Sequence, residues 1–179
     1  MQIQQAMLAR GDRSNFTKCM QVSHVEVNGK VLGVVGAGTI GREVIKVAQA
    51  LGMKVLAYTR TPRADEDNLK YVSLEELLKQ SDYISLHCPL TPQTRHMINK
   101  ETIAMMKPTA YIINTGRGAL IDEPALIEAL KEGRIAGAGL DVQETEPPVQ
   151  DNPLYDMPNV ILTPHMGWKG LETRQRLVS

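Results

Sequence analysis

The stretch VLGVVGAGTIGREVIKVAQALG, from Val31 to Gly52, decides the fold. It opens with a short apolar run that contains β-branched residues, which predicts a buried strand over residues 31–35. A glycine-rich loop follows, and residues 40–51 then show helical periodicity. Gly52 is typical of a residue that ends a helix. The face of this helix that we expect to point inward consists of Ile40, Val44, Val47, Ala48 and Leu51.

The loop GAGTIG places glycine in the spacing G-x-G-x-x-G. Gly36 permits the tight turn, Gly38 lets backbone N–H groups approach a pyrophosphate, and Gly41 lets the helix pack close to the strand. The start of the helix adds free N–H groups and partial positive charge. Because a strand precedes the loop and a long helix follows it, the motif predicts a dinucleotide-binding site rather than a chance cluster of glycines.

Strands and helices continue to alternate along the chain. A helix that opens with a Ser73–Glu76 capping box is predicted over residues 73–80, and another over residues 123–132. Further strands are predicted over residues 54–58, 83–86, 111–114, 136–142 and 160–163. This alternation implies βαβ crossovers. We therefore expect an α/β fold of the Rossmann type, a doubly wound parallel sheet with helices on both faces that make three layers.

Length, charge and cysteine content restrict the class of protein. The 179 residues fit one domain with a sizeable core, and 20 basic residues balance 20 acidic ones. This balance gives no support for a nucleic-acid partner. The two cysteines show no metal-ligand spacing, so we expect no metal site. The cysteines also give no disulfide framework, so we expect a reducing, cytoplasmic setting, and no apolar run is long enough to span a membrane, so we expect no membrane partner.

The end of the second predicted strand bears on the choice of cofactor. A carboxylate is expected there in an NAD site, because it accepts hydrogen bonds from the ribose hydroxyls. Here Thr59 takes the place of the acid, and Arg60 and Arg63 follow. Arginine would pair with a 2′-phosphate that a carboxylate would repel. The sequence thus allows NAD or NADP and favours NADP, while the alternative is that both arginines are ordinary surface residues.

Three further stretches carry a resemblance to a known family. They are SDYISLHCPLTPQTRHMIN (residues 81–99), INTGRGALIDEPALIEALKEGRIAGAGLDVQETEP (residues 113–147) and TPHMGW (residues 163–168). Together with GAGTIG they closely resemble the D-isomer-specific 2-hydroxyacid dehydrogenases, from about Val31 to the end of the chain. The resemblance implies a catalytic set of Arg117 in N-x-x-R-G, Glu146 in D-V-x-x-x-E-P and His165 in P-H-x-G.

The chemistry of a 2-oxo acid suits these three residue types. Its reduction needs a hydride, a proton for the developing alkoxide and a counter-charge for the carboxylate. A histidine such as His165 is the natural acid near neutral pH. A carboxylate such as Glu146 fixes the histidine tautomer, and the planar donors of Arg117 match a carboxylate. Taken singly, each residue also has a structural reading, as a loop cap, one more acid in an acidic loop, or a hydrogen-bonded core histidine.

The resemblance also implies cofactor contacts. Thr39 and Ile40 would meet the pyrophosphate, and Asp141 would accept from the nicotinamide carboxamide. The other implied contacts are His87, Cys88 and Pro89 on the adenosine side with Thr94 nearby, Thr115 and Gly116 under the nicotinamide ribose, and Gly167 of the P-H-x-G motif. His87 is as easily read as a packed loop residue. Cys88 has no adjacent base, and we read it as a small packed residue rather than a nucleophile.

Within the family, the run HMGWKGLETRQRL resembles the glycerate dehydrogenase and hydroxypyruvate reductase branch, which implies hydroxypyruvate or glyoxylate as the 2-oxo substrate. A homodimer is implied by the resemblance as well. Family members are much longer and carry a second, substrate-binding domain. We therefore read residues 1–22 as a remnant of the inter-domain helix and its connector, and residues 23–179 as the dinucleotide-binding domain, cut at the C-terminal crossover helix.

These expectations leave the activity of the chain open. Without the second domain the chain is expected to bind cofactor with little or no turnover. The alternative is a dinucleotide-sensing, protein-binding module like the co-repressor relatives of the family. A short-chain reductase would need a tyrosine with lysine four residues later, and no tyrosine of the chain has one.

Overall fold

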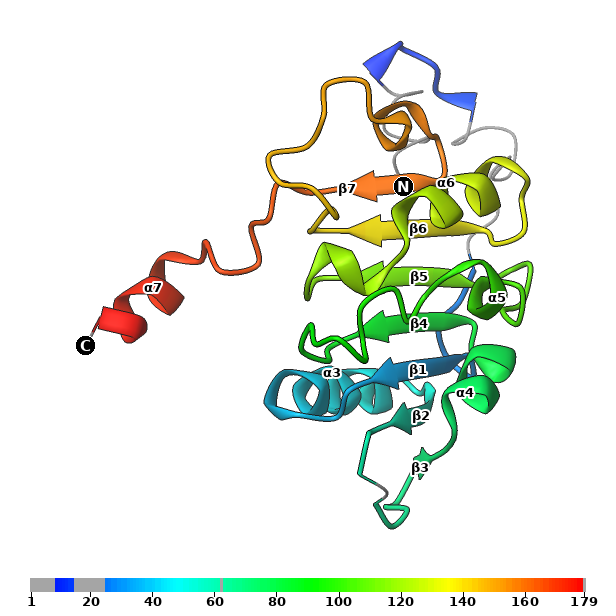
Figure 1. Ribbon diagram of the computed structural model, residues 1–179, viewed down its shortest axis with the longest axis vertical. Coiled ribbons are helices and arrows are strands. Elements are labelled where there is room, and N and C mark those ends of the chain that lie inside the picture. Colours follow the sequence, from blue (N-terminus) through cyan, green and yellow to red (C-terminus); the bar gives the residue numbers. More distant parts are fainter. Residues whose placement is uncertain (1–8, 15–24, 62, 179) are drawn as a thin grey trace.

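The computed structural model describes residues 9–14, 25–61 and 63–178. Its centre is a sheet of seven parallel strands in the order β3-β2-β1-β4-β5-β6-β7 (Figure 1). The strands are β1 (Val31–Val35), β2 (Lys54–Tyr58), β3 (Leu69–Tyr71), β4 (Tyr83–Leu86), β5 (Tyr111–Asn114), β6 (Gly137–Leu140) and β7 (Val160–Leu162). The order runs outward from β1 in both directions, which is the doubly wound topology that the alternation predicted.

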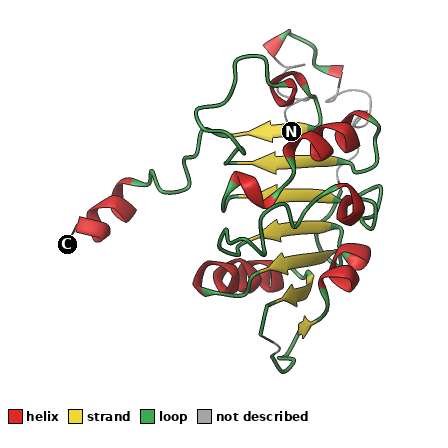
Figure 2. Ribbon diagram, viewed as in Figure 1, coloured by secondary structure: helices red, strands yellow, loops and turns green. Residues whose placement is uncertain are grey.

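Helices cover the two faces of this sheet (Figure 2). One face packs against α3 (Thr39–Ala50), and the other against α4 (Leu74–Gln80), α5 (Lys100–Ile103) and α6 (Glu123–Lys131). Two separate apolar clusters record this arrangement, because alternate strand residues point to opposite faces. In β1, for example, Leu32 and Val34 pack with Ile45 of α3, whereas Val35 packs with Leu77 of α4. The expected three layers are therefore confirmed.

The inner face of α3 differs from the prediction. Ile40, Val47 and Leu51 were expected inside, but 69%, 61% and 54% of their surfaces are exposed. The buried residues are Gly41, Ile45 and Ala48. Ile45 and Ala48 follow Gly41 by four and seven residues, so the three lie along one side of the helix. Gly41 sets this orientation, because a Cβ there would collide with the carbonyl oxygen of Gly36. The close approach of helix and loop therefore overrides the apolar stripe that periodicity alone would choose.

Local sequence signals account for most helix and strand ends. The Oγ atom of Ser73 accepts the N–H of Glu76 at 3.1 Å, as the capping pattern predicted. Gly133 follows α6 with a positive φ of 67°. The strands β6 and β7 end before Asp141 and Thr163, earlier than predicted, because the chain leaves the sheet there to form loops.

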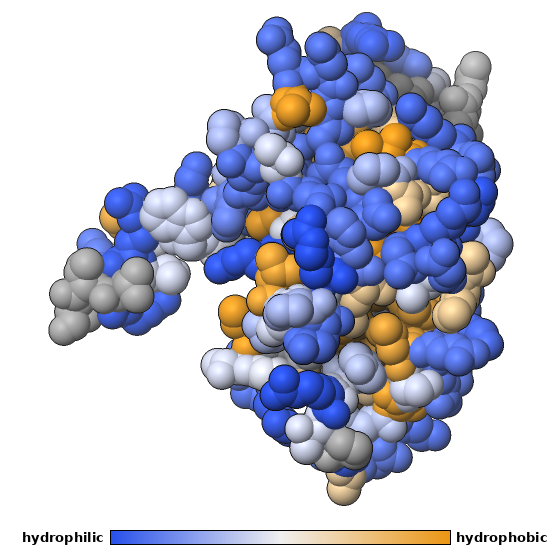
Figure 3. All heavy atoms as spheres, viewed as in Figure 1, coloured by the Kyte–Doolittle hydropathy of each residue, from blue (hydrophilic) through white to orange (hydrophobic). Residues whose placement is uncertain are grey.

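Several short or peripheral elements were not predicted. They are β3, α5, the 3-10 helices η1 (Gly118–Leu120) and η2 (Pro153–Asp156), and α7 (Leu171–Val178). A three-residue edge strand and a single helical turn give little periodic signal. Figure 3 shows that α7 and the segment leading to it project from the body as an arm.

The first part of the chain is only partly described. Of residues 1–22, which the sequence led us to read as a helix remnant and its connector, only residues 9–14 are among the described residues. Of the helices that the structure describes, none combines the length and apolar character needed to cross a lipid bilayer.

Candidate active site

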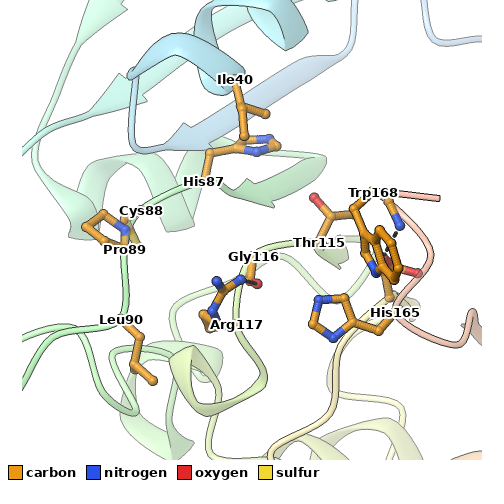
Figure 4. A pocket seen from close by; sticks show the side chains of 12 residues that line it. Ile40, His87, Cys88, Pro89, Leu90, Thr115, Gly116, Arg117, His165 and Trp168 are labelled. Carbon is orange, nitrogen blue, oxygen red and sulfur yellow. Dashed lines mark hydrogen bonds between the residues drawn. The ribbon is translucent and has the colours of Figure 1, made fainter. Parts of the chain in front are cut away.

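A cavity of about 690 Å³ opens at the edge of the sheet where the strands end. Parallel strands place all their carboxyl ends at this edge, where ligands bind in open α/β sheets. Figure 4 shows Ile40 and His87 on one side of the cavity and Arg117 and His165 on the other. The lining residues are Ile40, His87, Cys88, Pro89, Leu90, Thr115, Gly116, Arg117, Asp141, His165, Gly167 and Trp168.

The glycine loop forms one end of this region. Gly36 has a φ of +100°, and a Cβ there would lie 2.7 Å from the backbone nitrogen of Cys88. Gly38 is the N-cap of α3 and has no capping side chain, and no acidic residue stands in the first turn. A Cβ on Gly38 would meet nothing within 4 Å, so the space in front of the helix is open. These features fit the pyrophosphate of a dinucleotide.

Arg117 is held by a buried asparagine at the end of β5. The Nδ2 atom of Asn114 donates to the carbonyl oxygen of Arg117 at 2.9 Å, and its Oδ1 atom accepts the N–H of Gly116 at 3.0 Å. The Arg117 side chain is exposed, and its Nη1 atom donates to the Gly116 carbonyl oxygen at 2.8 Å. In the part of the chain that the structure describes, no carboxylate pairs with Arg117, so its charge is available to a ligand.

Gly118 brings the loop of Arg117 against the loop that follows β6. A Cβ on Gly118 would overlap the backbone of Gln143 and Glu144. Only glycine therefore permits this approach. Two residues beyond Glu144, the side chain of Glu146 turns toward the P-H-x-G loop.

His165 and Glu146 form a hydrogen-bonded pair. The Nδ1 atom of His165 lies 2.6 Å from Oε2 of Glu146, whose Oε1 atom accepts the N–H of Gln143 at 3.0 Å. Burial alone would raise the pKa of Glu146, but these hydrogen bonds and the charge of His165 lower it below its usual value. Because an ionised carboxylate can only accept, Nδ1 carries a proton. The pairing leaves Nε2 for a ligand in the cavity.

Asp141 fixes the backbone on which His165 sits. Its Oδ1 atom accepts from Thr163 Oγ1 at 2.5 Å and from Met166 N–H at 2.9 Å, and its Oδ2 atom accepts from Gly167 N–H at 2.9 Å. Burial would raise the pKa of Asp141, but these three bonds and the charge of His165 lower it. The N–H of His165 donates to the Asp141 carbonyl oxygen at 2.8 Å, and His165 takes a φ of +48°.

Asp141 therefore has a structural task beside the expected contact with the carboxamide. Its Oδ1 atom accepts two hydrogen bonds, whereas Oδ2 accepts one and retains a lone pair. That lone pair belongs to the oxygen beside Gly167, a residue that lines the cavity.

The residues after β4 are held mainly by short-range contacts. The Nε2 atom of His87 lies 2.8 Å from Ser85 Oγ, and burial lowers the pKa of His87, so the ring is neutral at neutral pH. Burial raises the pKa of the Cys88 thiol, which opposes a role as nucleophile. Thr94 does not line the cavity, since its hydroxyl donates to the Pro89 carbonyl oxygen at 2.7 Å and so braces the turn.

The residues that favour NADP lie away from the cavity lining. The hydroxyl of Thr59 donates to the Thr61 carbonyl oxygen at 2.7 Å, and Arg60 and Arg63 are exposed beyond the end of β2. Glu66, an acidic group within the influence of the Arg63 charge, is already paired with Arg42 at 2.8 Å. This pairing lowers the pKa of Glu66, with a small contribution from the charge of Arg63.

Three positioning residues were not singled out from the sequence. Asn114 and Thr163 hold the loops of Arg117 and His165, and Gly118 permits the loops to meet. Two signals were available: Asn114 and Gly118 belong to the N-x-x-R-G motif, and a polar asparagine at the end of a buried strand needs internal partners. Among the described residues, no group of three or more His, Cys, Asp or Glu side chains is arranged to hold a metal ion.

Comparison with known proteins decides the family. Residues 2–167 match the family model described as the NAD binding domain of D-isomer specific 2-hydroxyacid dehydrogenases. The chain belongs to this dehydrogenase family. It is 51% identical over 156 residues to a hydroxypyruvate reductase of Blautia hydrogenotrophica, which covers 86% of this chain and 48% of that protein. It is also 51% identical over 152 residues to a glyoxylate reductase of Thermococcus litoralis, which covers 83% of this chain and 46% of that protein.

A solved structure of the dehydrogenase family gives the same result. The NAD-complexed D-isomer specific 2-hydroxyacid dehydrogenase of Lactobacillus delbrueckii ssp. bulgaricus superimposes with a TM-score of 0.83 at 34% identity. The match covers 97% of this chain and 57% of that one. The chain spans about half the length of the curated dehydrogenases that it matches. The expected family, fold and nicotinamide cofactor are thus confirmed.

Proposed function

We propose that the chain supplies the cofactor-binding half of an enzyme that transfers a hydride between a nicotinamide dinucleotide and a small D-2-hydroxy acid. Glycerate and hydroxypyruvate, or glyoxylate, are the favoured substrates, because relatives at 51% identity are named hydroxypyruvate reductase and glyoxylate reductase, and one at 49% identity is named glycerate dehydrogenase. The observation that carries the proposal is the His165–Glu146 pair, which stands at the same cavity as Arg117.

The three residues have distinct tasks in the proposed reduction. When bound, the reduced nicotinamide supplies the hydride that reaches the carbonyl carbon of the 2-oxo acid. The Nε2 atom of His165 gives a proton to the carbonyl oxygen as the C–O double bond becomes a single bond. Glu146 holds Nδ1 and stabilises the imidazolium before that transfer. Arg117 offers paired donors to the substrate carboxylate and to the charge that develops on the oxygen.

The same proposal assigns roles to the residues around the cofactor. Gly36, Gly38, Thr39, Ile40 and Gly41 would hold the pyrophosphate at the start of α3. Thr59, Arg60 and Arg63 favour NADP over NAD, since exposed guanidinium groups suit a 2′-phosphate. The remaining proposed contacts are His87, Cys88, Pro89, Thr115, Gly116, Asp141 and Gly167, while Thr94 supports Pro89 from outside the cavity.

The chain on its own is proposed to bind cofactor with little or no turnover. The side chain of His165 is 42% exposed, and Arg117 is exposed as well, so water reaches both groups. A proton donor that water reaches is poorly positioned and poorly shielded. We also propose a cytoplasmic homodimer, with the exposed Val47 and Leu51 near the end of α3 available for contact. Light scattering on purified chain tests the dimer, and a monomer mass would contradict it.

Oxidation of NADPH by the chain with hydroxypyruvate, repeated with NADH and with glyoxylate, tests the proposed function. We expect both cofactors to bind, with the lower dissociation constant for NADPH, and no turnover at ordinary enzyme rates. Tighter binding of NADH would contradict the assignment of Arg60 and Arg63. Rapid turnover would show that these residues already form a complete site, and failure to bind either cofactor would contradict the proposal as a whole.

A further inference from the structure

A second charged cluster lies beside the catalytic residues and joins three loops. Its centre is Glu144, whose side chain is only 21% exposed. The Oε1 atom of Glu144 lies 2.9 Å from Nη2 of Arg95 and 2.6 Å from Nε2 of His96. Arg95 and His96 belong to the segment after β4, whereas Glu144 belongs to the loop after β6. One carboxylate oxygen therefore connects two loops that are far apart in the sequence.

The backbone and the second oxygen of Glu144 reach a third element, the start of α6. The N–H of Glu144 donates to Oε2 of Glu123 at 3.1 Å, and Oε2 of Glu144 accepts the N–H of Glu123 in a long bond of 3.5 Å. Glu123 is fixed in turn by Asn152, whose Nδ2 atom donates to its Oε1 at 2.8 Å. The exchange of two bonds between Glu123 and Glu144 anchors the loop to the helix.

The partner segment is itself tied to the loop of Arg117. The N–H of His96 donates to the carbonyl oxygen of Ala119 at 2.9 Å, and the N–H of Ile98 donates to that of Leu120 at 3.1 Å. His96 has a φ of +50°, a conformation that a non-glycine residue keeps only when its surroundings hold it. The ring contact with Glu144 is part of that support.

We propose that Glu144 is a positioning residue for the proposed reaction. It clamps the loop after β6 to Arg95, to His96 and to the start of α6, and thereby places Glu146 against His165. The inference rests on the proposed function, because it gives the Glu146–His165 pair its purpose. Glu146 follows Glu144 by only two residues. The side chain of Glu146 itself bonds to the N–H of Gln143, and the bonds of Glu144 are the contacts that hold the adjoining loop to other elements.

The pKa of Glu146 reports directly on this positioning. The charged groups that face its carboxylate are His165, which lowers its pKa, and Asp141, which raises it. If the loop shifts, Glu146 loses its bond to His165 and its pKa rises. A merely electrostatic effect has the opposite sign, because removal of a nearby negative charge lowers the pKa of a carboxyl group.

The experiment is a pH titration of the Glu146 carboxyl carbon by ¹³C NMR in the whole chain, with the signal assigned from its loss in Glu146→Gln. We expect Glu144→Gln to raise the pKa of Glu146 toward its usual value. Glu144→Asp, which keeps the charge but shortens the reach, should raise it as well. Glu128→Gln is the matched control, because Glu128 also pairs with two cations, Lys100 and Arg134, but lies on the exposed part of α6.

A fall in the pKa of Glu146, or no change, in a folded Glu144→Gln chain would overturn the proposal. If Glu144→Gln does not fold, Glu144→Asp decides by the same criterion. A rise of equal size in Glu128→Gln would also overturn it. Binding of NADH and NADPH is measured on the same samples, so a wild-type chain that binds neither would contradict the proposed function while the titration still judges the clamp.

Discussion

At the residue scale, His165 depends on two carboxylates with different tasks. Glu146 bonds to its ring, whereas the Asp141 carboxylate accepts from the Thr163 hydroxyl before it and from the N–H groups of Met166 and Gly167 after it. The left-handed φ of His165 shows how strongly the local backbone is constrained, since histidine rarely takes this conformation without support. The side chain and the main chain of the proposed acid are therefore fixed independently.

We predict that Asp141→Asn destabilises the chain and loosens the loop of His165. An amide has one acceptor oxygen where the carboxylate has two, so it cannot accept from Thr163, Met166 and Gly167 at once. The loss of buried hydrogen bonds should lower the free energy of unfolding by about 1–3 kcal/mol, as measured by urea denaturation. Asp151→Asn, at an exposed loop position, is the control, and equal stability losses in both variants would contradict the assignment.

Single residues could be predicted from the sequence where they belong to a recognisable motif. Arg117, Glu146 and His165 stand in motifs, so their identities could be read from the chain before any geometry was known. Their supports could not: Thr163 meets Asp141 only where the ends of β6 and β7 come together, and the bonds of Asn114 within its own loop depend on a turn that gives no periodic signal. The bonds of Glu144 to Arg95 and His96 likewise join positions that are 49 and 48 residues apart.

At the element scale, the turn from β1 into α3 is set by three glycines with separate reasons. Gly36 needs a positive φ, Gly41 needs to touch the Gly36 carbonyl group, and Gly38 needs neither. The open space at Gly38 is the place where the proposed phosphates approach. Fold and binding can therefore be separated by mutation within one loop.

We predict that two alanine substitutions in that loop affect different properties, one the stability of the fold and the other the binding of the cofactor. Gly41→Ala should lower the free energy of unfolding by about 1–3 kcal/mol, because the added methyl group overlaps backbone atoms. Gly38→Ala should change it by less than about 0.5 kcal/mol but weaken cofactor binding, because the methyl group occupies the phosphate space. Urea denaturation and calorimetric titration check the pair. Unchanged affinity in Gly38→Ala would contradict the assigned phosphate site.

The edge of the sheet opposite the cavity supplies a pH-dependent contribution to stability. Asp82 accepts from Val31 N–H and from Lys107 Nζ, both at 2.8 Å, and so joins β1 to the segment before β5. Burial would raise the pKa of Asp82, but these bonds and the charges of Lys107 and Lys30 lower it. A carboxyl group whose pKa is lower in the folded than in the unfolded chain stabilises the fold above its unfolded pKa.

The sign of the effect follows from this difference. The stabilisation by Asp82 is present above about pH 4, the usual pKa of an aspartate, and is lost as the pH falls through the lower folded value. We predict that Asp82→Asn lowers stability at pH 7 and shows a smaller further loss between pH 5 and acid conditions, both measured by urea denaturation. Asp156→Asn, an exposed position, should behave like the wild type. A parallel acid decline in Asp82→Asn and wild type would contradict this role.

The predictability of elements follows their length and periodicity. Strands buried on both faces and the helices that open with capping residues gave clear signals and are confirmed. The prediction for the inner face of α3 was right at Val44 and Ala48 but wrong at Ile40, Val47 and Leu51, because the close contact at Gly41, and not the apolar stripe, fixes the rotation of the helix. The short strand β3 pairs with β2 over only three residues, and such a segment carries too little pattern to be read from sequence.

At the scale of the whole molecule, the doubly wound sheet brings together side chains from four strand ends and one helix. The cavity is bounded by α3, by the segments after β4 and β5, and by the loops after β6 and β7 (Figure 4). The order of the strands brings these loops to one place, and the alternation of strands and helices in the sequence predicts that order. The contacts between the loops also shape the cavity, and the sequence does not predict them. Trp168 is the one tryptophan of the chain and lines this cavity.

We propose that the nicotinamide dinucleotide lies in this cavity, with its reactive ring beside His165. The most direct test is a titration of the chain with NADPH and NADH, in which the fluorescence of Trp168 and of the reduced nicotinamide is recorded. We predict saturable quenching of Trp168 with energy transfer to the nicotinamide, and loss of both in Gly38→Ala. Binding shown by calorimetry without any change in Trp168 emission would place the cofactor outside this cavity and contradict the proposed site.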